Sequence, residues 1–182
     1  LLCQEACDAI RQAARQQGFN ERQVLHAEAG FDWGQLYEAG ASLSLFAEKR
    51  LIELRIANGK PGDKGASALL DYLQRPAEDT LLLISLPKLD GSTQKSKWAK
   101  ALIDGAHSQF LQIWPVDSSQ LPGWIRQRLA LAGLAASPEA LELISARVEG
   151  NLLAAAQEIE KLKLLADGQQ VDVDSVQASV AD

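Results

Sequence analysis

One stretch of the sequence is almost continuously apolar and bounds the possible folds: Thr80-Leu81-Leu82-Leu83-Ile84-Ser85-Leu86, followed by Pro87. A strand with one face in water alternates apolar and polar residues, whereas this run has apolar residues at both parities. It is therefore typical of a strand that is covered on both faces, as the strands of parallel sheets are.

The segments around this run alternate between strand and helix patterns. Further strands are predicted over residues 23–28, 50–57 and 109–113, and helices over residues 1–17, 32–42, 63–74 and 92–104. In residues 50–57, the set Ile52, Leu54 and Ile56 faces inward, while Glu53 and Arg55 face outward. Helices of this length between strands imply right-handed crossovers. The predicted fold class is therefore α/β, with a parallel sheet and flanking helices.

The pattern changes after Pro115 and becomes mainly helical. Helices are predicted over residues 119–131, 138–148 and 151–166, followed by an extended piece over residues 170–173 and a last helix that begins near Asp174. Ser137 before Pro138, and Asn151 after Gly150, are residue pairs typical of helix boundaries. We expect two domains, an α/β domain over residues 1–116 and a small helical domain over residues 117–182.

The composition suits a globular protein outside the membrane. Of the 182 residues, 47% are hydrophobic, and no apolar run approaches the roughly 20 residues that cross a bilayer. We expect no signal peptide ahead of the first helix. Cys3 and Cys7 lie one helical turn apart, which favours small buried residues in a reducing compartment over a disulfide or a metal site. The expected location is the cytoplasm.

The net charge of −6 argues against a broad surface that grips phosphate groups. A local basic patch remains open, because Lys88, Lys95, Lys97 and Lys100 lie within a short stretch. The favoured alternative is that these lysines form the solvated face of one amphipathic helix, which is the commoner origin of such a cluster.

Residues for catalysis are not found in the sequence. The Walker pattern is absent, and the loop over residues 59–65 has glycines and lysines at the wrong spacing. The strands predicted over residues 50–57 and 80–86 lead into Ala57-Asn58 and Pro87-Lys88, so neither of these two offers a carboxylate for Mg²⁺. With only two histidines, no nucleophile and base pair emerges. We expect no catalytic residue, no cofactor and no metal.

Two large apolar residues, Leu45 and Phe46, stand where neither neighbouring element can absorb them by periodicity. They fall opposite the apolar stripe of the helix over residues 32–42, and Glu48, Lys49 and Arg50 separate them from the next strand. The pair is a candidate plug for a partner's pocket. The alternative, that it folds back over the helix end, is the commoner arrangement for such connections.

Two motifs resemble a known family. One is Ser44-Leu45-Phe46-Ala47 followed by Lys49-Arg50-Leu51, and the other is Glu149-Gly150-Asn151-Leu152-Leu153 followed by Glu158-Ile159-Glu160-Lys161-Leu162. A weaker similarity is Leu121-Pro122-Gly123-Trp124-Ile125. Together they resemble the delta subunit of the bacterial DNA polymerase III clamp loader, a member of the AAA+ superfamily that does not itself hydrolyse ATP.

The resemblance implies a clamp-binding role without catalysis. In that family an apolar tip inserts into a pocket of the ring-shaped sliding clamp and favours ring opening. By position, Leu45 and Phe46 would be inserted, with Leu43 and Ser44 beside them. The implied partners are the sliding clamp (the beta subunit), other clamp-loader subunits, and primed DNA within the assembled complex. The enzyme would be the DNA-directed DNA polymerase holoenzyme, a nucleotidyltransferase complex.

The resemblance also implies the nature of the helical domain and of the sheet. The helical domain over residues 117–182 would be an AAA+ lid, with Leu153 at the place where active subunits carry an arginine, so that apolar packing is expected of it. The family's first strand would be missing ahead of residue 1, and its place in the sheet lies between residues 80–86 and 109–113. The alternative function is an α/β nucleotide-binding ATPase whose phosphate loop lies in that missing segment.

Overall fold

The computed structural model describes residues 1–41, 49–77, 79–165 and 170–179. The chain divides into two compact units, Leu2–Gln112 and Ile113–Asp182, and each is described by itself. None of the helices in these ranges combines the length and the apolar character needed to cross a membrane.

The first unit alternates helices and strands along the chain. Its elements are α1 (Leu2–Gln16), β1 (Phe19–His26), α2 (Gly34–Ala41), β2 (Lys49–Arg55), α3 (Gly62–Gln74), β3 (Thr80–Ser85), α4 (Gly91–Gln94) and α5 (Lys97–Asp104). The strands form one sheet in the order β1-β2-β3, and both pairs are parallel. Leu54 at the centre lies opposite Leu25 on one side and Ile84 on the other. The predicted α/β class with a parallel sheet is confirmed.

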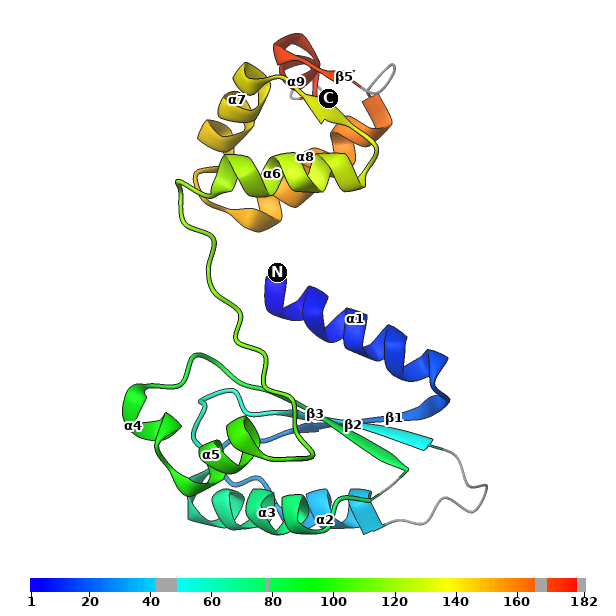
Figure 1. Ribbon diagram of the computed structural model, residues 1–182, viewed down its shortest axis with the longest axis vertical. Helices are drawn as coiled ribbons and strands as arrows, with labels where there is room; N and C mark the ends of the chain where they lie inside the picture. Colours follow the sequence, from blue (N-terminus) through cyan, green and yellow to red (C-terminus); the bar gives the residue numbers. More distant parts are fainter. Residues whose placement is uncertain (42–48, 78, 166–169, 180–182) are drawn as a thin grey trace. The chain divides into compact units, whose positions relative to one another are not determined.

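Helices cover both faces of this sheet (Figure 1), with α2 and α3 on one face and α1 on the other. The core on the α2–α3 side contains Ile52, Leu54 and Ile56, the inward set predicted for β2. They pack with Leu36 of α2 and Leu69 of α3, and all five are at most 1% exposed. Burial of each such side chain contributes about 2 kcal/mol, so this layer holds α2 and α3 firmly against the sheet.

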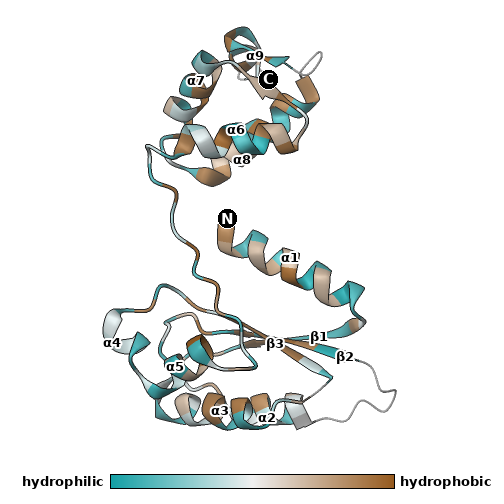
Figure 2. Ribbon diagram, viewed as in Figure 1, coloured by the Kyte–Doolittle hydropathy of each residue, from teal (hydrophilic) through white to brown (hydrophobic). Residues whose placement is uncertain are grey.

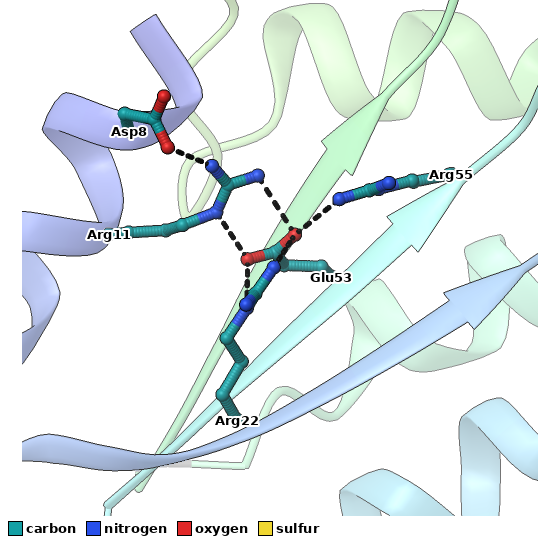
Figure 3. Close-up of polar contacts among 5 residues, drawn as sticks. All are labelled: Asp8, Arg11, Arg22, Glu53 and Arg55. Carbon is teal, nitrogen blue, oxygen red and sulfur yellow. Dashed lines mark hydrogen bonds and ion pairs between the residues drawn. The ribbon is translucent and has the colours of Figure 1, made fainter. Parts of the chain in front are cut away.

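On the opposite face of β2, where Glu53 and Arg55 were both predicted to face outward, only Arg55 is exposed. Glu53 is only 2% exposed, because α1 lies over it. Figure 3 shows Arg11 of α1 and Arg22 of β1 converging on its carboxylate, each with its Nε atom 2.6 Å from Oε1. Arg55 lies 3.5 Å from Oε2 on the same strand. The buried charge is therefore compensated by arginines from three elements.

The strand predicted over residues 109–113 is absent, and the structure gives these residues no regular secondary structure. β3, whose residues are mostly apolar (Figure 2), is an edge strand, paired with β2 alone among the described strands. Its six side chains are all half-buried. Phe110, Leu111 and Trp114 are 46%, 65% and 63% exposed. An isolated strand cannot satisfy its backbone N–H and C=O groups, and this segment pairs with none of the described strands.

Two smaller expectations also fail. The helix predicted over residues 92–104 is divided into α4 and α5, because the Ser96 hydroxyl accepts a hydrogen bond from the Ala99 amide and starts a new helix. Cys3 is exposed and Cys7 half-buried, so the prediction of two buried cysteines was wrong. Ala14 is the only residue of α1 that is buried, because α1 covers the sheet through its C-terminal half.

The second unit is mainly helical. Its elements are α6 (Leu121–Leu131), β4 (Ala135–Ala136), α7 (Pro138–Val148), α8 (Leu152–Leu165), β5 (Gln170–Val171) and α9 (Val173–Ala178). The core of the unit contains Ile125, Leu129, Ile144 and Leu162, all completely buried. Ser137 caps α7 through the Ala140 amide, at 3.1 Å, as its place before Pro138 predicted. The two short strands pair in parallel, and the Ser137 amide before α7 donates to the Val171 carbonyl of β5 at 3.0 Å.

Candidate functional site

The four residues predicted to bind the clamp, Leu43, Ser44, Leu45 and Phe46, lie outside the described residues. The structure describes the elements on both sides of them, the end of α2 at Ala41 and the start of β2 at Lys49. The described part of the candidate site is therefore the end of α2 and the start of β2, which we call the frame of the segment.

Arg50 joins the two sides of this frame. Its Nη1 atom donates a hydrogen bond of 2.9 Å to the Ala39 carbonyl in the last turn of α2, and its Nη2 atom lies 2.9 Å from Oε2 of Glu21 in β1. The last carbonyls of a helix have no partner within the helix, so the guanidinium satisfies an acceptor that would otherwise be buried and unpaired. These Arg50 contacts hold the end of α2 against the start of β2.

The burial of Arg50 is a feature that the sequence reasoning missed. Arg50 is 8% exposed, although it was grouped with Glu48 and Lys49 as a charged separator. The signal was present, since Arg50 has the same parity as the inward set Ile52 and Leu54 of β2. Lys49, of the opposite parity, is exposed, and its ammonium lies 5.3 Å from the centre of the Phe19 ring.

A cavity of about 450 Å³ lies between the C-terminal halves of α2 and α3. We call it the α2–α3 pocket; it is lined by Tyr37, Gly40, Asp71, Tyr72, Gln74, Arg75 and Ala77. Tyr37 is 42% exposed, and its hydroxyl donates to Asp71 Oδ2 at 2.8 Å. Gly40 faces the Tyr72 ring so closely that a Cβ would lie 2.8 Å from Cε2.

The lysine cluster lies on α5 and the residues before it. Lys97 and Lys100 are exposed, while Trp98 and Ala99 between them are buried. Lys97 also lines a second cavity, of about 510 Å³, together with Lys60 in the loop before α3. This arrangement suits the solvated face of an amphipathic helix, and contact with DNA remains a prediction.

Two further expectations concerned the absence of a metal site and the packing of Leu153. No group of three or more histidine, cysteine or acidic side chains that could hold a metal occurs within residues 1–41, 49–77, 79–165 and 170–179. Leu153, near the start of α8, is 55% exposed, so the apolar packing expected of it is not found in the part that the structure describes. Asn151 caps this helix, with its Oδ1 atom 3.1 Å from the amides of Leu153 and Ala154. The cap holds the first turn of α8 in place and leaves the Leu153 side chain pointing outward.

Comparison with known proteins identifies the family of this chain. The family model described as "DNA polymerase III, delta subunit" matches residues 1–108. The chain is 30% identical over its whole length to DNA polymerase III subunit delta of Escherichia coli K12, of which it covers 52%. It is 31% identical over 91% of its length to the subunit of the same name from Haemophilus influenzae, of which it covers 48%. The chain thus spans about half the length of these curated relatives.

A solved structure shows the same fold. The Bacillus subtilis DNA clamp loader delta protein matches 97% of this chain with a TM-score of 0.69, at 24% sequence identity, and the match covers 54% of that protein. The resemblance drawn from the sequence motifs is therefore confirmed, and so is the fold, a parallel sheet with flanking helices followed by a helical unit. The chain belongs to the DNA polymerase III delta subunit family.

Proposed function

We propose that this chain is the clamp-binding part of a clamp-loader delta subunit. In this proposal Leu45 and Phe46 enter an apolar pocket of the sliding clamp, with Leu43 and Ser44 beside them. The family match supports it, because residues 1–108 include this segment. The Arg50 contacts are the structural observation that carries it, since they fix both ends of the segment relative to the sheet.

A fixed frame suits an apolar anchor for a physical reason. Binding costs free energy when mobile groups become ordered, and a segment whose two ends are already held loses less freedom on docking. A few well-placed apolar side chains carry most of the affinity of a typical interface. We infer that residues 43–46 supply the affinity and that α2, β1 and β2 supply the rigid support.

The proposed effect on the clamp requires no catalysis by this chain. A subunit that binds the opened ring more tightly than the closed ring shifts the equilibrium by that difference in binding free energy. The other proposed partners are clamp-loader subunits, with primed DNA engaged only in the assembled complex. Nucleotide hydrolysis and DNA synthesis are proposed to belong to other subunits of the polymerase holoenzyme.

The test is the affinity of the chain for a purified sliding clamp, measured by isothermal titration calorimetry. Leu45→Ala with Phe46→Ala should weaken binding about a hundredfold or more, because each lost anchor costs about 2 kcal/mol. The melting temperature should change little, since an anchor that fills a partner's pocket adds little to the fold of the free chain.

The matched control removes two exposed leucines elsewhere. Leu164 and Leu165, in α8, are 87% and 47% exposed, and truncation of both to alanine should leave the affinity for the clamp unchanged. The proposal is wrong if the Leu45 and Phe46 variant binds the clamp normally while it loses several kcal/mol of folding free energy.

A further inference from the structure

One hydrogen bond joins the two ends of the chain stretch that contains residues 43–46. It runs from Arg50 Nη1 to the Ala39 carbonyl over 2.9 Å, between residues 11 positions apart in the sequence. This contact fixes the distance between the ends of the stretch, which reduces the number of conformations that a short stretch of chain can adopt. Whatever holds the Arg50 guanidinium in place therefore also determines how firmly the stretch is held.

The carboxylate of Glu21 holds the other side of this guanidinium. Its Oε2 atom lies 2.9 Å from Arg50 Nη2, and the Glu21 side chain is 44% exposed. A guanidinium is planar and rigid, so partners on two of its nitrogens fix its orientation as well as its position. Loss of the Glu21 carboxylate would remove one of these two fixed points.

An irregularity in β1 places Glu21 where it can make this contact. Phe19 of β1 lies opposite Lys49 of β2. The next residue of β2, Arg50, lies opposite Glu21, so that Asn20 is an extra residue in β1. An extra residue of this kind is a β-bulge, which is rare between parallel strands and re-aims the side chains beside it. A regular register would turn Glu21 to the other face of the sheet, so the bulge is what brings a carboxylate to the buried guanidinium.

We propose that Glu21 and Arg50 are positioning residues of the clamp-binding segment. Their ion pair holds the ends of the segment and thereby raises its affinity for the sliding clamp, although neither residue enters the clamp's pocket. This inference rests on the function proposed above. Arg50 is 8% exposed, so it acts on a partner through the residues that it holds. When the pair is loosened, the apolar side chains remain, but more freedom is lost when they dock, and the affinity falls.

Two variants of Glu21 separate position from charge in a measurement of affinity for purified sliding clamp. Glu21→Asp keeps the negative charge but shortens the side chain, so the carboxylate is withdrawn from Arg50. It should weaken clamp binding about five- to tenfold. Glu21→Gln loses the charge but keeps an oxygen that can accept from Nη2, and it should bind within about twofold of the wild type.

Glu53→Gln is the matched control. It also disturbs a buried ion pair of β2, but on the opposite face of the strand, where Arg11 of α1 and Arg22 donate to Glu53. It should lower the stability of the fold and leave the affinity for the clamp unchanged at a temperature where the chain is folded. The melting temperature of each variant is measured first, so that affinities are compared between folded proteins.

A positioning role also predicts that the effects are not additive. In the background of Leu45→Ala with Phe46→Ala no apolar anchor remains to be positioned, so Glu21→Asp should have little further effect on clamp binding. A further loss as large as that seen without these two changes would show that Glu21 acts on the clamp directly, and it would overturn the inference.

The outcomes separate this inference from the proposed function. If Leu45→Ala with Phe46→Ala weakens binding while Glu21→Asp changes only the melting temperature, the pair is purely structural and the positioning role alone is overturned. If Glu21→Gln weakens binding and Glu21→Asp does not, the effect is one of charge, and the positioning role is again wrong. If the wild type binds no clamp, the proposed function and this inference both fail.

Discussion

At the scale of single residues, two buried charges define the first unit. Arg50 is buried because its guanidinium satisfies a helix carbonyl and pairs with Glu21. Glu53 is buried on the other face of the same strand because Arg11 and Arg22 donate to it. A charge inside a protein is tolerated only when partners replace its hydration. These contacts therefore connect α1, β1, β2 and α2 more specifically than apolar packing could.

The Glu53 cluster predicts a pH dependence of stability. Burial alone would raise the pKa of Glu53, but hydrogen bonds from Arg11 and Arg22 outweigh it and hold the pKa at about 2, below the usual 4.5. A carboxyl whose pKa is lower in the folded state stabilises the fold above the unfolded pKa, and this contribution is lost as the pH falls from about 5 to about 2. Stability measured by urea unfolding should fall across that range.

The variant Glu53→Gln tests the cause of this dependence. It should lower the free energy of unfolding at pH 7 by about 2 kcal/mol, because the remaining amide cannot compensate two arginines. It should also flatten the decline between pH 5 and pH 2. If stability declines as steeply in the variant as in the wild type, the effect belongs to other carboxyl groups. The comparison variant is Asp8→Asn, which removes a carboxylate at the exposed edge of the cluster.

At the scale of elements, α2 depends on close contact with α3. Gly40 allows the Tyr72 ring to approach the α2 backbone, and the Arg50 contacts secure the C-terminal turn of the same helix. A short helix such as α2 has little stability of its own, so these tertiary contacts determine where it ends. The frame of the candidate site is thus set by packing between elements.

Gly40→Ala should destabilise the first unit. The added Cβ would lie 2.8 Å from Tyr72 Cε2, so the ring or the helix must shift, and overpacking of this kind costs about 1–3 kcal/mol. Gly123→Ala, in α6, is the control, because no atom lies within 4 Å of its added Cβ. It should be neutral or stabilising by about 0.5–1 kcal/mol. Equal effects of the two variants in thermal unfolding would contradict the close packing of α2 on Tyr72.

At the scale of the whole molecule, the chain has two separate cores. One surrounds Ile52 and Leu54 of β2, and the other surrounds Ile125 and Ile144 of the helical unit. Among the residues that the structure describes, no buried one belongs to both clusters. Two cores of this kind allow one unit to lose stability without the other.

Ile144→Ala should therefore act on one unit only. Ile144 is completely buried in α7, and truncation of such a side chain costs about 2–5 kcal/mol. Hydrogen exchange measured by mass spectrometry should accelerate in α7 and α8 and remain unchanged in β2 and β3. Faster exchange throughout both units would show that they unfold as one.

Much of the fold followed from local pattern. The run over residues 80–86 predicted a strand in a parallel sheet, and β3 over Thr80–Ser85 is parallel to β2. The helix boundaries at Ser137 and Asn151 were predicted because caps depend on side chains within a few residues. The strand at residues 109–113 was wrong because a strand requires a neighbour, and apolar sequence alone does not provide one.

The sequence alone was enough to predict the α/β class, the alternation of helices and strands as far as β3, the family, and residues 43–46 as the candidate site. These depend on periodicity and on motifs, which are properties of neighbouring residues. Only the tertiary structure decided that Arg50 and Glu53 are buried and that Tyr37, Tyr72 and Arg75 line one pocket. The physical reason is that periodicity shows which residues share a face, whereas the burial of that face depends on elements far away in the chain.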